Sequence, residues 1–94
     1  MLSEDLRGWV RAALVKHSRL RLETIGEDQY LAKDLGFDSF ALLQVVLDLE
    51  DRLGIEIDAE KLAGLRDMTF REFVELVDAQ VAGADVVSPG GNAP

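Results

Sequence analysis

The sequence contains no cysteine, which excludes a disulfide framework, a thiolate metal site and a cysteine nucleophile. Any thiol chemistry would therefore require a group attached to the chain later. The only histidine, His17, cannot build a metal cluster by itself, and no catalytic set accompanies it. We therefore expect no metal site, and the sequence shows no obvious catalytic set.

Long apolar runs are also missing, since no stretch approaches the roughly 20 residues that span a bilayer. The N-terminus, "MLSEDLRGWV", carries acids early and lacks the basic-then-apolar pattern of a signal peptide. We therefore expect a cytoplasmic protein with no membrane insertion. The 94 residues, 48% of them hydrophobic, suffice for one small domain with a thin core.

Basic residues are few, and the formal net charge is -8. The first 22 residues carry five basic and two acidic side chains, a balance of +3, so the remainder carries -11. An acidic body repels phosphate backbones, which argues against nucleic acid as a partner. It favours basic patches on other proteins, although the acids could equally serve only solubility. The basic first segment could contact an acidic partner, or simply form a solvated face.

Two helices are predicted in the first half of the chain. The first begins near Ser3, and the second spans about Ser39–Leu53, with Asp38 as its N-cap and Gly54 beyond its end. Each carries apolar residues at helical spacing. The inward stripes are Leu6, Val10, Ala13, Leu14 and His17 in the first helix, and Leu42, Val45, Val46, Leu49 and Leu53 in the second.

The second half predicts a short helix after Asp58 and a longer one that opens on a capping box, Thr69 with Glu72. Gly and Pro accumulate from Gly83, where the helical period stops. We therefore expect a domain over residues 1–82 and a disordered tail or linker over 83–94. The fold class is all-α: a monomeric bundle of three longer helices and one short third helix.

A long first loop, residues 18–37, separates the first two helices. It shows no sustained period, and loops of this length in compact domains often carry function. We expect its apolar residues to pin it to the core. These are Leu22, Ile25, Tyr30, Leu31 and Leu35.

The end of this loop reads "DLGFDSFALLQ", residues 34–44, and places Asp38 and Ser39 between two phenylalanines. Residues 34–58 resemble the modification site of acyl carrier proteins, in which D-x-G-x-D-S places a serine at the start of the second helix. The "GIEID" after the second helix and the "TFREFVELV" of the last helix also fit. The resemblance covers roughly residues 4–81 and implies the acyl-carrier four-helix fold.

The resemblance implies that Ser39 carries a 4′-phosphopantetheine arm, attached from coenzyme A by a phosphopantetheinyl transferase. The thiol of the arm would then hold acyl groups as thioesters. The start of a helix suits the anionic phosphodiester, because free backbone N–H groups and the positive end of the helix dipole lie there. Asp38 would cap the helix and help present the site, and Gly36 would allow the tight backbone entry. Ser39 needs no activating base of its own, since the transferase supplies it, and the resemblance therefore implies a carrier that other enzymes act on, with no catalytic residues and no enzyme activity of its own.

The second helix is, by the same resemblance, the surface that partner enzymes read. Such partners are acyl-loading and condensing or tailoring enzymes with basic docking patches. Core packing remains an alternative for Leu43 and Leu47, and a solvated helix end for Glu50 and Asp51. The expected recognition residues are Phe40, Leu43, Leu47, Glu50 and Asp51.

The "DSFALL" stretch looks closer to discrete carriers of polyketide-type pathways than to fatty-acid carriers. A peptidyl or aminoacyl carrier is an alternative, although such carriers usually show paired glycines where this chain has Gly36-Phe37-Asp38. An unmodified helical docking domain is a second alternative. Because a helix follows Met1 almost at once, we expect a freestanding protein. Related carriers can fold the acyl chain into a cleft, for which Val46, Leu62 and Leu65 are candidates.

Overall fold

The computed structural model describes the backbone of residues 2–18 and 24–90, and side chains within 5–18, 24–58 and 60–83. Its elements are the helices α1 (Leu2–His17), α2 (Ser39–Leu53), α3 (Ala59–Leu62) and α4 (Phe70–Gly90), with a 3-10 turn, η1 (Leu65–Asp67), before α4. Within these ranges no strand forms beyond one isolated bridge. The expected all-α fold is confirmed.

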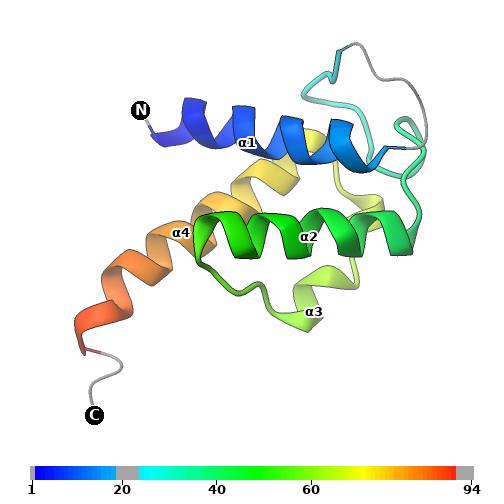
Figure 1. Cartoon of the computed structure of the whole chain (residues 1–94). Coiled ribbons are helices and arrows are strands. Elements are labelled where there is room, and N and C mark those ends of the chain that lie inside the picture. Colours follow the sequence, from blue (N-terminus) through cyan, green and yellow to red (C-terminus); the bar gives the residue numbers. More distant parts are fainter. Residues whose placement is uncertain (1, 19–23, 91–94) are drawn as a thin grey trace.

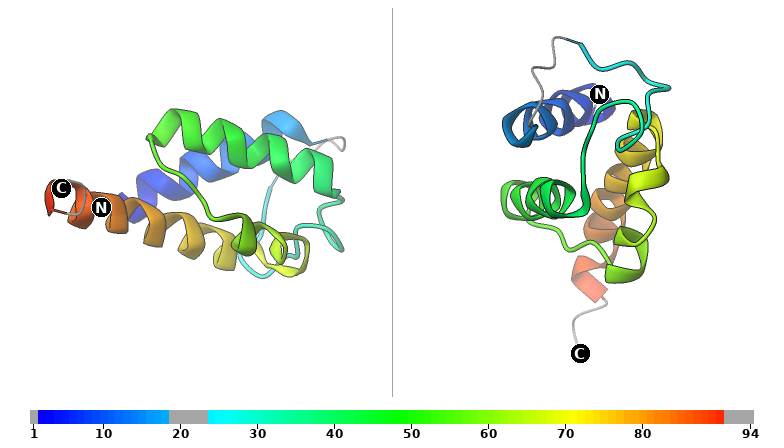
Figure 2. Two further views of the ribbon diagram at one scale, coloured as in Figure 1. Left: turned by 90° about the horizontal axis from the view of Figure 1, so that it is seen from below. Right: turned by 90° about the vertical axis from the view of Figure 1, so that its right-hand side faces the viewer.

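The three longer helices form the frame of the bundle (Figure 1). α1 and α2 lie side by side and run in opposite directions, and the described part of the long loop, from residue 24, leads into the start of α2. α4 packs against α1, and η1 packs against α2. Figure 2 shows α1 and α2 nearly end-on in its right-hand view, with α3 below α2. None of the described helices is long and apolar enough to cross a bilayer.

The core forms where the apolar stripes of the helices meet. Val10 of α1, Val45 of α2 and Phe73 of α4 are fully buried. His17 stays half-buried at the edge, and Leu53 and Val81 are only partly covered. Burial of each large apolar side chain contributes roughly 1.5–3 kcal/mol to the stability of the fold. Together these contributions have to outweigh the conformational entropy that the chain loses on folding.

The long loop is tied to the start of α4. The N–H of Leu31 donates to the carbonyl of Met68 at 2.9 Å, and the N–H of Phe70 donates to the carbonyl of Gln29 at 2.9 Å. Of the expected pins, Ile25, Leu31 and Leu35 are buried, whereas Tyr30 remains 40% exposed. Leu22 lies outside the described residues. The loop is therefore ordered by both apolar burial and backbone hydrogen bonds where it approaches α2.

The basic residues of α1 make contacts within the protein. Arg7 Nε lies 2.8 Å from Glu27 Oε2, which joins α1 to the long loop. The hydrogen bond from Arg7 lowers the pKa of the Glu27 carboxyl despite the opposing effect of burial, and the charge of Arg71 adds to the lowering. The Arg11 guanidinium lies 5.3 Å from the ring centroid of Phe70. These three arginines thus help to hold α1, the loop and α4 together.

The observed helix ends can be compared with the capping signals in the sequence. The capping box of α4 is confirmed: Thr69 Oγ1 accepts from the N–H of Glu72 at 3.2 Å, and Glu72 Oε1 accepts from the N–H of Thr69 at 3.0 Å. α1 begins at Leu2, one residue before the expected start near Ser3. Asp58 precedes α3 as expected, without a side-chain capping hydrogen bond.

α4 continues to Gly90, beyond the expected end of the helical period at Gly83. A glycine in a helix costs only about 1 kcal/mol relative to alanine, so Gly83 weakens the helix without ending it. The final turns of α4 project away from the other helices (Figures 1 and 2). The assignment of residues 83–94 to a tail outside the domain stays a prediction.

Candidate functional site

Ser39 is the first residue of α2, and its side chain is exposed. Asp38 caps the helix as expected: its Oδ1 accepts from the N–H of Ala41 at 2.8 Å. The other end is also confirmed, because Gly54 has φ 69° and its N–H donates to the carbonyl of Glu50 at 2.8 Å. Both ends of α2 are thus fixed by local chemistry, and the Ser39 hydroxyl lies in its first turn, facing solvent.

The backbone enters α2 through a tight turn. Gly36 has φ 77°, a left-handed conformation that favours glycine, and its N–H donates to the carbonyl of Ala32 at 3.0 Å. Phe37, the next residue, is buried. Phe37 and Leu42 occupy the two positions of a hydrophobic staple, one before the N-cap and the other in the second turn, and both are buried. This pairing was readable in the sequence and fixes the angle at which Ser39 is presented.

A hollow of about 350 Å³ lies beside Ser39, between α2 and the α3–η1 segment. Leu62 and Leu65 line it, as expected for a cleft that could receive an acyl chain. Val46, also expected there, does not line it and packs in the core. Leu42, one turn nearer to Ser39, takes the place expected for Val46. The remaining lining residues are Leu43, Ala63 and Arg66.

An apolar stripe runs along the outer face of α2 from the Ser39 end. Phe40, Leu43 and Leu47 are 62%, 44% and 53% exposed, and their spacing of three and four residues places them on one helix face. Leu43 and Leu47 are therefore surface residues rather than core residues. Asp51, also exposed, continues this face by one further turn. We call Phe40, Leu43 and Leu47 the α2 stripe.

Glu50, grouped with the α2 stripe by sequence, is engaged within the protein. It is half-buried, and its Oε2 accepts a hydrogen bond from the N–H of Ile57 at 2.8 Å. A carboxylate near a helix C-terminus opposes the helix dipole, but a charge-assisted hydrogen bond offsets that cost. Glu50 therefore fixes the segment that leads from α2 to α3. Its expected role in partner recognition stays a prediction.

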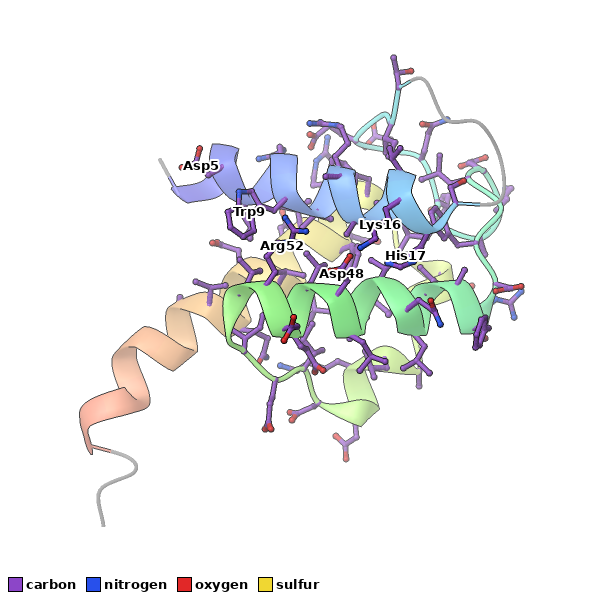
Figure 3. The ribbon with its side chains drawn as sticks, viewed as in Figure 1. Asp5, Trp9, Lys16, His17, Asp48 and Arg52 are labelled. Atoms are coloured by element: carbon purple, nitrogen blue, oxygen red, sulfur yellow. The ribbon has the colours of Figure 1, made fainter. Side chains whose placement is uncertain are left out.

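A small polar cluster joins α1 to α2 (Figure 3). Asp48 Oδ2 lies 3.2 Å from His17 Nε2 and 3.6 Å from Lys16 Nζ. Burial by itself would raise the pKa of Asp48, but the hydrogen bond from His17 and the charges of Lys16 and Arg52 outweigh it and lower the pKa. Arg52 also lies over the Trp9 ring, 5.4 Å from its centroid. This cluster supports the packing of α1 on α2.

Replacing Asp48 by asparagine should lower the free energy of unfolding by about 1 kcal/mol at pH 7. Folding lowers the pKa of Asp48. Its contribution to the free energy of unfolding is therefore fully present above the ordinary aspartate pKa of about 4, and it is lost as the pH falls through the lower pKa of the folded protein. Urea unfolding of both proteins at several pH values measures this difference. Asp51→Asn, an exposed change on the same helix, is the matched control. A difference that stayed constant down to pH 2 would contradict the assignment.

Comparison with known proteins identifies the family. Residues 8–77, more than half of the chain, match the family model described as "Phosphopantetheine attachment site". The chain belongs to the acyl carrier protein family. It is 35% identical over 92 residues to an acyl carrier protein of Streptomyces coelicolor, covering 98% of this chain and 90% of the relative. It is 30% identical over 70 residues to an acyl carrier protein of Chloroherpeton thalassium, covering 71% of this chain and 88% of the relative.

Membership of this family implies a covalently attached 4′-phosphopantetheine, a transferase that attaches it, and enzymes that act on it. The residues of this carrier fit such a group. Ser39 offers an exposed hydroxyl at a helix start, and the neighbouring hollow offers apolar side chains such as Leu62 and Leu65. No group of three or more metal-ligating side chains occurs among the described residues.

Proposed function

We propose that Ser39 carries the 4′-phosphopantetheine arm, and that the arm presents acyl intermediates as thioesters to partner enzymes. The observation that supports this most directly is the exposed hydroxyl at the first residue of α2, inside the segment that matches the family model. Asp38 and Gly36 support the site by capping α2 and by turning the backbone into it. The protein would then act as a carrier and not as a catalyst.

Attachment forms a phosphodiester between Ser39 Oγ and the phosphate of the arm, while the nucleotide part of coenzyme A departs. The serine hydroxyl loses its proton in this step. His17, the only histidine, lies on α1 and pairs with Asp48. It does not line the hollow beside Ser39. The proposal therefore assigns deprotonation to the transferase, and this chain contributes the position of the hydroxyl.

The pathway is proposed to be of polyketide or fatty-acid type. The residues before Ser39 are Gly36-Phe37-Asp38, and the burial of Phe37 gives the middle position a packing role that a second glycine could not fill. This favours an acyl carrier over a peptidyl carrier. Mass spectrometry of the thioester isolated from the native host would identify the cargo, and an aminoacyl cargo would overturn this choice.

The test of the function itself is modification of the whole chain. Incubation with coenzyme A and a promiscuous phosphopantetheinyl transferase should add about 340 Da, one arm per chain. Intact-protein mass spectrometry measures the addition. No addition under conditions that modify an established carrier would reject the proposal and favour an unmodified helical docking domain.

The α2 stripe is proposed as the surface that the transferase and later enzymes contact. Leu47→Ser should lower kcat/KM for modification about tenfold, equivalent to about 1.4 kcal/mol, because the stripe loses an apolar anchor. Val15→Ser on α1 is the matched control, since Val15 is 46% exposed and lies outside the stripe. Steady-state kinetics of arm transfer measure both. Equal rates for the two variants would show that Leu47 makes no such contact.

A further inference from the structure

Arg66 lies close to the proposed attachment residue although the sequence separates them widely. It belongs to η1, and it lines the same hollow as Ser39. Its position is fixed through its backbone, because η1 packs against α2 and the carbonyl of Arg66 accepts from the N–H of Ala32 at 3.3 Å. The fold therefore brings one cationic side chain to the rim of the apolar hollow at the start of α2.

The charge of Arg66 is available to a ligand. Its side chain is exposed, and within the described side chains its guanidinium makes no ion pair or hydrogen bond. Lys33 lines a neighbouring hollow together with Arg66, but Lys33 does not line the hollow of Ser39, and its Nζ lies 5.9 Å from the ring centroid of Tyr30. Arg66 is thus the cation that lines both hollows, on a chain whose net charge is -8.

We propose that Arg66 binds the phosphodiester of the arm attached at Ser39. This inference rests on the proposed function, since the phosphodiester exists only in the modified chain. The guanidinium donates N–H groups in a planar fork that matches phosphate oxygens, and no covalent bond forms or breaks in this contact. The anion at Ser39 would be covalently placed at the hollow that Arg66 lines, so their contact would need no bimolecular binding step.

The contact would direct the base of the arm. With its phosphate on Arg66, the arm leaves Ser39 toward the hollow lined by Leu62 and Leu65 and away from Phe40 on the α2 stripe. Exposed ion pairs are weak, so the pair should favour this direction by a factor of about two to five and should not lock the arm. Salt should reduce the preference, because exposed charges are screened.

The test compares the modified forms of the wild type, Arg66→Gln and Lys33→Gln, each loaded with the arm and left with a free thiol. Both substitutions remove one positive charge, but only Arg66 lines the hollow of Ser39. Proton–nitrogen NMR should show a shift of the Arg66 Nε–Hε signal between the unmodified and modified wild type. The ³¹P signal of the arm should move in Arg66→Gln and stay at the wild-type position in Lys33→Gln.

The outcomes separate this inference from the proposed function. If the chain gains no arm mass, the proposed function fails first. If the arm is attached but the Arg66 signal stays fixed, or if both variants move the ³¹P signal equally, the Arg66 contact is wrong while the carrier function stands. A wild-type shift that fades in 0.5 M salt and is partly retained by Arg66→Lys, seen as a ³¹P position between those of wild type and Arg66→Gln, supports direct ion pairing.

Discussion

Ser39→Ala is expected to abolish the mass gain from coenzyme A completely, from about 340 Da in the wild type to zero. The substitution removes the oxygen that would form the phosphodiester and leaves no other hydroxyl at the start of α2. Because the side chain is exposed and alanine is a good helix former, the free energy of unfolding should change by no more than about 0.5 kcal/mol. Intact-protein mass spectrometry and thermal unfolding measure the two effects.

Ser18→Ala is the control for this experiment, because Ser18 is a second described serine, following α1 and outside α2. It should gain the arm as the wild type does. If Ser39→Ala were still modified, peptide mapping would locate the arm on another hydroxyl, and the assignment of Ser39 would be wrong. If Ser39→Ala lost both the modification and the helical circular dichroism, Ser39→Cys, which stays close in size, would separate unfolding from loss of the acceptor oxygen.

Phe73→Ala should destabilise the domain by about 3–5 kcal/mol, the range for removing a buried phenylalanine side chain. Phe73 is 0% exposed and lies on the face of α4 that enters the core. Natural domains are stable by about 5–15 kcal/mol, so this one substitution should leave a small domain close to unfolding. Urea unfolding followed by circular dichroism measures the loss.

Phe40→Ala is the matched control, since it makes the same chemical change at a residue that is 62% exposed. We expect a stability change within about 0.5 kcal/mol and, by contrast, slower arm transfer because Phe40 belongs to the α2 stripe. If Phe40→Ala destabilised the protein as much as Phe73→Ala, Phe40 would have to be a core residue. The pair therefore separates what the two phenylalanines do.

The sequence predicted both ends of α2 correctly because local chemistry decides them. Asp38 and Gly54 mark the ends of α2, and both ends are confirmed with their hydrogen bonds. The capping box at Thr69 likewise predicted the start of α4. Such signals lie within a few residues of the structure that they determine, so periodicity and capping preferences are sufficient to find them.

Features that depend on tertiary packing could not be predicted in the same way. Periodicity placed Val46 on a buried face but could not tell a core position from the wall of the hollow beside Ser39. In the structure Leu42, and not Val46, is among the residues that line this hollow. The hydrogen bond from Ile57 to Glu50 depends on how the segment after α2 folds back, which no spacing reveals. The proximity of Arg66 to Ser39 likewise arises only when η1 packs on α2.

The contact between Arg52 and Trp9 makes Trp9 an intrinsic fluorescence probe of the packing between α1 and α2. Trp9 is the single tryptophan, and it joins α1 to the last turn of α2, whereas Ser39 begins the opposite end, about 20 Å away along the helix. Its fluorescence emission should follow separation of the two helices and remain insensitive to whatever is attached at the far end. Unmodified and loaded forms can thus be compared for stability on one intrinsic signal, without a label.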